Sequence, residues 1–148
     1  MRRSPLDLDP EALDVRSRLT ESQRSVLTGQ VRAARAAAQA VTMLFIHSPH
    51  HPGQWLDGSV ALQDLGDNLY VAAFVRCHID RGCALAERMV RLARDPRVRV
   101  GVAQVLPDGA SLDATLERGE QALSRASVAG PVASMHWADT SREFLPAI

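Results

Sequence analysis

The chain has 148 residues, of which 46% are hydrophobic and 23% charged, and this predicts one compact domain with a single core. Seventeen basic and seventeen acidic residues give a formal net charge of zero, which argues against a general DNA or RNA binder. All the basic residues are arginine, which excludes Schiff-base and P-loop lysine chemistry. Because guanidinium groups bind carboxylates and phosphates well, a local site for an anion stays open.

The N-terminal residues contain no apolar run typical of a signal peptide, and no segment reaches the roughly 18 apolar residues of a membrane span. We therefore expect a cytoplasmic protein that does not insert into membranes. Cys77 and Cys83 are six residues apart and match no CxxC or zinc-ribbon spacing. They are predicted to be two reduced thiols.

Turn residues and hydrophobic periodicity predict the elements of the chain. Residues 1–17 are expected to be a flexible lead-in, residues 18–138 a single domain and residues 139–148 a tail. The predicted elements, in chain order, are a helix over 20–39, a buried strand over 41–46, a loop over 47–53, a hairpin of strands 60–64 and 69–75, a helix over 80–94, a strand over 98–105, a helix over 111–130 and a strand over 132–137. This order predicts an α/β fold with a mixed central β-sheet and helices packed on it.

Several segments, in their order along the chain, resemble the motifs of one known protein family. They are the hairpin turn Leu65-Gly66-Asp67-Asn68-Leu69, the strand Val98-Arg99-Val100-Gly101-Val102-Ala103, the turn Gly109-Ala110-Ser111-Leu112, and the helix from Gln121 to Gly130. Together they are similar to the signature turn and the closing strand, turn and helix of a GGDEF domain. This family makes cyclic di-GMP from two GTP molecules. The resemblance implies a shortened version of the GGDEF, nucleotide-cyclase-palm-like topology.

The resemblance also locates the positions at which the family binds metal. In the family, the first aspartate after the strand and the acidic third residue of the signature hold two divalent cations, which activate a 3′-hydroxyl and neutralise the triphosphate. Here the first position is His47, which is a poor ligand for Mg²⁺. Asp67 is the one acid kept in the signature, and Asn68 replaces the glutamate. We therefore expect a degenerate domain without cofactor or cyclase activity.

Further departures concern the nucleotide. The lysine and arginine that contact phosphate in the family correspond to Ser127 and Pro131. The connection after the first strand has no room for the family's guanine-binding helices. The inhibitory product site of the family needs an RxxD motif, but the equivalent residues 56–59 read LDGS.

The short connection over 47–59 has a structural consequence as well. A parallel crossover normally needs a dozen or more residues and usually forms a helix. One face of the sheet is therefore expected to lose a covering helix and to expose apolar side chains, which a partner protein, a second copy or the N-terminal helix would cover. Trp55, His50 and His51 form the predicted interaction surface. The expected function is a regulatory, protein-binding module in bacterial cyclic di-GMP signalling, with a link to exopolysaccharide or biofilm control.

Two alternative functions stay open. In the first, the chain is a receptor for cyclic di-GMP, with Arg76, Asp80 and Arg81 as phosphate contacts; Asp80 is equally suited to cap the following helix. In the second, it is a metal-dependent enzyme. His47, His50 and His51, with Asp67 nearby, are then the candidate ligands, and this set suits Zn²⁺ better than Mg²⁺.

Overall fold

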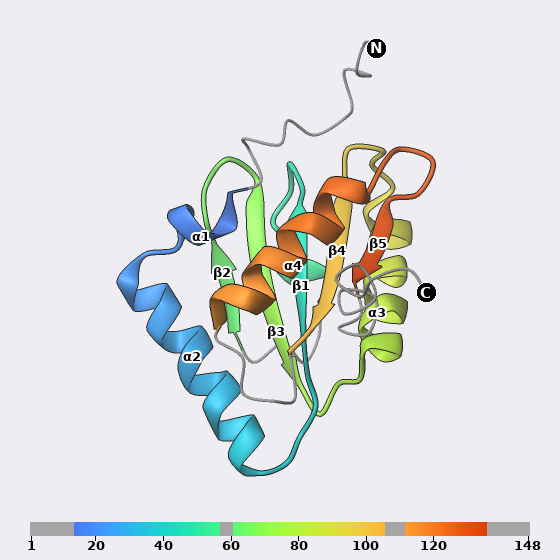
Figure 1. The fold of residues 1–148 in the computed structure, drawn as a ribbon. Helices are drawn as coiled ribbons and strands as arrows, with labels where there is room; N and C mark the ends of the chain where they lie inside the picture. The colour runs from blue at the N-terminus through green and yellow to red at the C-terminus, as the bar shows by residue number, and fades with distance from the viewer. Residues whose placement is uncertain (1–13, 57–60, 106–111, 136–148) are drawn as a thin grey trace, which may run out of the picture.

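The computed structural model describes residues 14–56, 61–105 and 112–135, and these form an α/β fold (Figure 1). The elements are α1 (Val15–Arg18), α2 (Glu21–Ala36), β1 (Val41–His47), the 3-10 turn η2 (Pro52–Gln54), β2 (Ala61–Asp64), β3 (Leu69–Val75), α3 (Ile79–Ala93), β4 (Arg99–Gln104), α4 (Leu112–Arg125) and β5 (Val132–Met135). None of the helices in these residues is long and apolar enough to cross a membrane.

The five strands form one mixed sheet in the order β2-β3-β1-β4-β5. β1 lies at the centre and pairs antiparallel with both β3 and β4, whereas β4 and β5 are parallel and are connected through α4. β2 is antiparallel to β3, so β1 and β2 run in the same direction with β3 between them. Residues 41–46 are all buried, which confirms the prediction of a strand covered on both faces.

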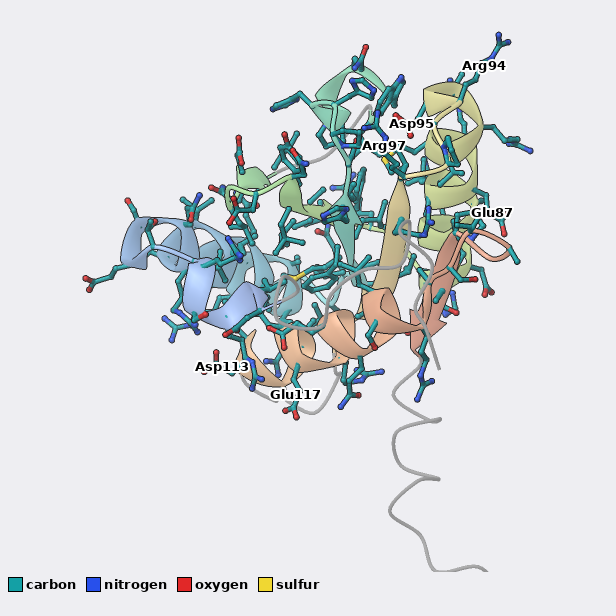
Figure 2. All side chains as sticks on the ribbon, turned by 90° about the horizontal axis from the view of Figure 1, so that it is seen from above. Glu87, Arg94, Asp95, Arg97, Asp113 and Glu117 are labelled. Atoms are coloured by element: carbon teal, nitrogen blue, oxygen red, sulfur yellow. The ribbon has the colours of Figure 1, made fainter. Side chains whose placement is uncertain are left out.

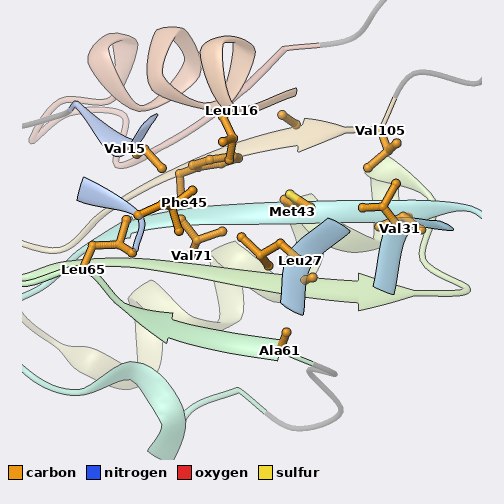
Figure 3. Packing of buried hydrophobic residues seen from close by; sticks show 14 of the residues in the cluster. Val15, Leu27, Val31, Met43, Phe45, Ala61, Leu65, Val71, Val105 and Leu116 are labelled. Carbon is orange, nitrogen blue, oxygen red and sulfur yellow. The ribbon is translucent and has the colours of Figure 1, made fainter. Parts of the chain in front are cut away.

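Alternate residues of the strands point into two separate hydrophobic clusters, as the twofold period of a strand requires. On one face, Met43 and Phe45 pack with α1, α2 and α4 (Figure 3). On the other face, Leu44 and Ile46 pack with Ile79, Ala86 and Met89 of α3. The predicted α/β architecture with a mixed sheet is therefore confirmed.

The N-terminal segment packs onto the domain in cis. Val15 of α1 is fully buried, and the backbone N–H of Arg16 donates to Glu120 of α4 at 3.0 Å. Arg24 of α2 binds Asp113 at the start of α4, with 2.5 Å between the nitrogen and the carboxylate oxygen. Figure 2 shows Asp113 on α4 next to the two N-terminal helices. The prediction of a flexible lead-in over 1–17 is wrong for residues 14–17, and its remaining residues lie outside the described ranges.

Most element boundaries agree with the predictions within a few residues, with three informative differences. α2 ends at Ala36 because Ala38 takes a left-handed conformation with φ of 56°. The cap of α3 is His78 rather than Asp80, since the His78 Nδ1 accepts a hydrogen bond from the Asp80 N–H at 3.4 Å. α4 ends at Arg125, before the predicted Gly130.

The expectation of an exposed apolar sheet face is wrong for the described residues. Tyr70, Ala72 and Phe74 lie on the α3 side of β3 and are at most 8% exposed. The loop after β1 covers part of this face without forming an α-helix: Leu56 is buried in the same cluster, and the His51 ring lies 5.4 Å from the Tyr70 ring. The large hydrophobic side chains that are exposed in the described residues lie off the sheet, at Val26, Leu92 and Val128.

Close contact between α4 and the sheet depends on two glycines, which gives a stability prediction. A Cβ on Gly101 would lie 2.5 Å from the Leu123 nitrogen, and a Cβ on Gly119 would overlap the fully buried ring of Phe45. We expect Gly119→Ala to lower the free energy of unfolding by about 1–3 kcal/mol, because the packed ring cannot move away.

The matched control is Gly29→Ala in α2, where nothing lies within 4 Å of the added methyl group. This variant should be about 0.5–1 kcal/mol more stable than the wild type, since alanine is the better helix former. Urea unfolding measures both changes. A Gly119→Ala protein as stable as the wild type would contradict this account of the helix–sheet contact.

Candidate functional site

The hairpin turn, the end of β1 and the start of β4 meet at one end of the sheet, which we call the turn end. His47 pairs with Leu69 of β3 on one side and with Arg99 of β4 on the other. The Ser48 N–H donates to the Asn68 carbonyl at 2.8 Å, which joins the residues after β1 to the turn. The structure therefore brings His47 and the signature-like turn together, as the resemblance implied.

The turn has a tightly fixed backbone. Gly66, Asp67 and Asn68 take left-handed conformations, with φ of 81°, 52° and 66°, and the Leu65 and Leu69 backbones are joined by a 2.9 Å hydrogen bond. Asp and Asn tolerate this region better than most residues do, since their short polar side chains form local hydrogen bonds. The turn thus presents the Asp67 carboxylate to solvent, with 74% of its side chain exposed.

An arginine of α1 forms an ion pair with this carboxylate. The Arg18 Nη1 lies 2.6 Å from the Asp67 Oδ2. Because the Arg18 backbone belongs to α1, which is anchored by the buried Val15, the guanidinium is held beside the turn. The negative charge at the acidic position of the turn is therefore balanced within the chain.

His47 is an imidazole in a partly buried site. Its Nδ1 is buried and has no hydrogen-bond partner among the described residues. Burial lowers the pKa of His47, the charge of nearby Arg99 lowers it further, and a hydrogen bond with the Arg97 backbone opposes both effects. Burial and the charge of Arg99 thus both favour the neutral form of this imidazole.

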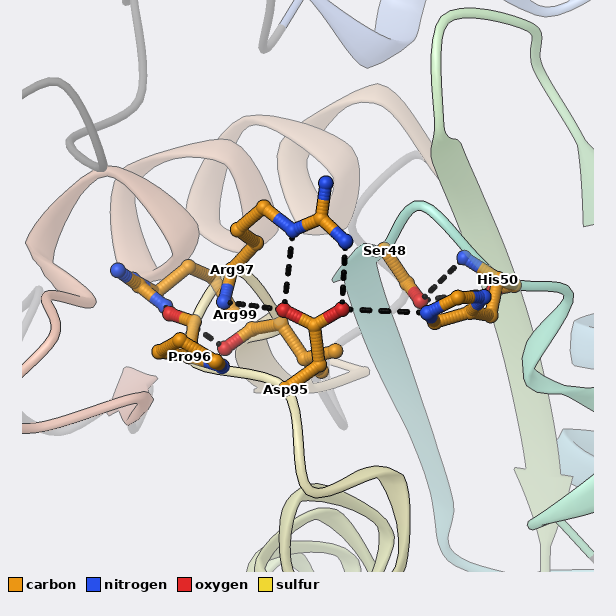
Figure 4. Close-up of polar contacts among 7 residues, drawn as sticks. Ser48, His50, Asp95, Pro96, Arg97 and Arg99 are labelled. Carbon is orange, nitrogen blue, oxygen red and sulfur yellow. Dashed lines mark hydrogen bonds and ion pairs between the residues drawn. The ribbon is translucent and has the colours of Figure 1, made fainter.

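The loop after β1 is held against the residues that precede β4 by His50, Asp95 and Arg97, which we call the Asp95 cluster (Figure 4). The Asp95 carboxylate accepts two hydrogen bonds from the Arg97 side chain, at 2.9 and 3.1 Å, and one from the Arg97 N–H at 2.9 Å. The His50 Nε2 lies 3.1 Å from the same carboxylate. The hydrogen bonds from Arg97 hold the pKa of Asp95 well below its usual range. This part of the loop is therefore ordered by electrostatics as well as by packing.

The rest of the loop is organised by its own polar groups. The buried Ser48 hydroxyl donates to the His50 carbonyl and accepts from the His50 N–H, at 2.7 and 3.1 Å. The His51 Nδ1 accepts from the Gly53 N–H at 3.1 Å and thereby caps η2. Trp55 is half-buried, packs against the α3-side cluster and meets the His50 ring edge-on at 6.3 Å.

Arg76, Asp80 and Arg81 do not belong to the turn end. They follow β3, whose last residue pairs with Val41 at the opposite end of β1. The Asp80 side chain is 85% exposed and lies 3.6 Å from its helix cap, His78. Arg76 has φ of 53°, and its guanidinium contacts the side chain of Gln39. Nothing in these contacts joins the three residues into one phosphate site.

Comparison with known proteins agrees with this arrangement. The sequence matches no family model and no curated protein. Among solved structures, it is similar to the crystal structure of the FimX GGDEF domain from Pseudomonas aeruginosa, with a TM-score of 0.58 and 16% identity; the match covers 76% of this chain and 93% of that chain. The chain has a GGDEF-like fold.

The residues of this GGDEF-like fold do not fit the two cations that the family would place at the turn end. The described residues hold no cluster of three or more His, Cys, Asp or Glu side chains arranged to bind a metal. In particular, His47, His50, His51 and Asp67 are not brought together. His51 accepts a hydrogen bond from the backbone of η2, and His50 makes one with Asp95. Asp67 is bound to Arg18. The metal-dependent alternative therefore has no ligand set in these residues.

Sequence reasoning missed the charged residues that organise this site. Arg18 directly follows the segment 1–17 that was expected to be a flexible lead-in, and Asp95 and Arg97 lie between the predicted helix over 80–94 and the predicted strand over 98–105. The available signal was the sequence Asp95-Pro96-Arg97 directly before a strand, since Asp often accepts hydrogen bonds from the backbone two residues later. No such local signal joins Arg18 to Asp67, which are far apart in the sequence.

The Asp95 cluster gives a prediction about stability and pH. We expect Asp95→Ala to lower the free energy of unfolding at pH 7 by about 1–3 kcal/mol, because several hydrogen bonds to a charged group are lost. A carboxylate whose folded pKa is lowered stabilises the protein above its unfolded pKa, and this stabilisation is lost as the pH falls through the lower folded value. The difference between the two proteins should therefore shrink below about pH 4.

Urea unfolding at pH 7 and at pH 3 measures this difference. The control is Asp80→Ala, which removes a side chain that is 85% exposed and should change stability by no more than about 0.5 kcal/mol. Equal effects of the two substitutions at pH 7 would show that the cluster does not hold the loop in place.

Proposed function

We propose that this chain is a catalytically inactive GGDEF-like module that acts by binding a protein partner, as a regulatory component of bacterial cyclic di-GMP signalling. The observation that carries the proposal is the state of the two positions at which the resemblance would place metal. His47 offers imidazole nitrogens instead of a carboxylate, and Asp67 is bound to Arg18. Mg²⁺ requires hard oxygen ligands, and a triphosphate cannot approach a second nucleotide efficiently without cations that neutralise its charge.

The binding surface of the proposal consists of His50, His51 and Trp55, next to the exposed turn over 66–68. Hydrogen bonds within the loop already fix its backbone, so that little conformational entropy is lost when a partner binds. A tryptophan with one exposed side is a favourable anchor for a protein interface. This surface replaces the sheet face as the physical basis of the interaction, because that face is covered within the chain. Control of exopolysaccharide production or biofilm formation is the setting we infer for it.

The first test of this function is enzymatic. The purified protein is incubated with GTP and either Mg²⁺ or Mn²⁺, and the products are examined by mass spectrometry. We expect no cyclic di-GMP and no shift of the thermal unfolding midpoint with either cation, because an ion that binds the folded state would stabilise it. Formation of cyclic di-GMP would refute the proposed inactivity.

The second test concerns the partner. The protein is immobilised and exposed to bacterial lysate, and a captured protein is then purified and its affinity for the wild type and for variants is measured by titration. Trp55→Ala should weaken this affinity by at least about tenfold, which corresponds to about 1.4 kcal/mol at a hot-spot residue. Circular dichroism checks that the variant is folded.

The matched control for this test is Val26→Ala, which removes another partly exposed apolar side chain, 44% exposed, from α2 on the opposite face of the sheet. This variant should bind like the wild type. Equal affinities of Trp55→Ala and the wild type would reject the proposed surface, whatever the identity of the partner.

A further inference from the structure

A hollow of about 680 Å³ lies at the end of the sheet opposite to the turn end. Its lining residues come from the last turns of α2, the connection to β1 and the end of β4. They are Arg32, Arg35, Ala36, Ala38, Gln39, Ala40, Val41, Gln104 and Val105. The volume is within the range of small-molecule sites in proteins, about 300–1,000 Å³.

The charge of the hollow is positive and is not balanced by its own lining. No carboxylate is among the described residues that line it. Arg16, Arg18 and Arg24 each lie beside a carboxylate. Arg32 and Arg35, by contrast, make no ion pair with any described residue, although they are three residues apart on one helix face. Like charges at this spacing repel each other, and a bound anion relieves the repulsion.

Two more guanidinium groups lie next to the walls of the hollow. With the Gln39 amide oriented so that its oxygen faces Arg76, this oxygen accepts from Nε at 2.8 Å and from Nη2 at 3.3 Å. The Arg118 side chain is buried and donates to the Gln104 carbonyl at 3.0 Å. Arg32 and Arg35 therefore line the space, and Arg76 and Arg118 each contact one of its lining residues.

Apart from Arg32, Arg35, Gln39 and Gln104, the lining consists of alanine and valine residues, which form an apolar wall. The carbonyls at the end of α2 do not compete for the arginines, because those of Ala33, Ala34 and Arg35 accept from the N–H groups of residues 37–39. A free phosphate would fill only a small part of the volume, so a larger molecule with both a phosphate and an apolar ring system makes better use of this lining.

We propose that this hollow binds a phosphorylated organic molecule of nucleotide size, with its phosphate at Arg32 and Arg35 and its ring against the alanine and valine wall. This site goes beyond the proposed protein-binding function and does not depend on it. It also gives Arg76 a role different from the predicted one. Arg76 acts on Gln39, which lines the hollow, rather than together with Asp80 and Arg81.

The test is calorimetric titration of the full chain with four probes: GMP, cyclic di-GMP, pyrophosphate and uncharged guanosine. We expect saturable binding of GMP or cyclic di-GMP, weaker binding of pyrophosphate and none of guanosine. Arg32→Gln and Arg35→Gln should each weaken the binding by about tenfold or more, as expected when a charged hydrogen-bond partner of phosphate is removed.

A pair of variants at one exposed position separates charge from shape. Ala36→Glu places a carboxylate at the hollow and should abolish binding, whereas Ala36→Gln adds a side chain of the same size without charge and should retain most of it. Absence of binding for all four probes at about 1 mM, or binding that Ala36→Glu leaves unchanged, overturns the site. Pyrophosphate that binds as tightly as the nucleotides overturns the proposed ligand size.

Discussion

The burial of β1 on both faces is the constraint on which the rest of the molecule depends. Its side chains alternate between two hydrophobic clusters, and its backbone pairs with β3 on one side and β4 on the other. A shift of the register by one residue would exchange the contents of the two clusters, so that the register is strongly specified. With β1 fixed, the hairpin turn is placed beside His47, and the end of α2 is placed beside Val41.

The sequence was sufficient for the elements of this fold and for its class, because strand and helix periods, turn residues and prolines are local signals. It failed where burial depends on the packing of distant segments. Val15 follows a polar segment and still enters the core, since α1 lies against α4. One face of the sheet was expected to be exposed for want of a helix, yet a short loop that contains Leu56, together with α3, is enough to cover Tyr70 and Phe74 on that face. The length of a connection does not reveal how well its side chains fill the space above a sheet.

For the candidate site, the resemblance located His47 and the turn at one end of the sheet, and the geometry agrees. The partners of these residues were not predictable from local sequence. Arg18 reaches Asp67 across 49 positions of the chain, and His50 reaches Asp95 across 45. Ion pairs of this kind arise from the tertiary structure and have no periodic signature. Together they give two of the possible metal ligands, His50 and Asp67, charged partners from distant parts of the chain.

The position of the two candidate sites at opposite ends of one strand has a consequence for regulation. Seven residues of β1 separate them by about 20 Å. For a ligand at one end to alter the other, β1 would have to slide or tilt, and its two packed faces and two hydrogen-bonded neighbours oppose both motions. Coupling between distant sites usually requires an element with two arrangements of similar free energy. Since β1 is packed on both faces and paired on both edges, we expect it to transmit little coupling between the two ends of the sheet.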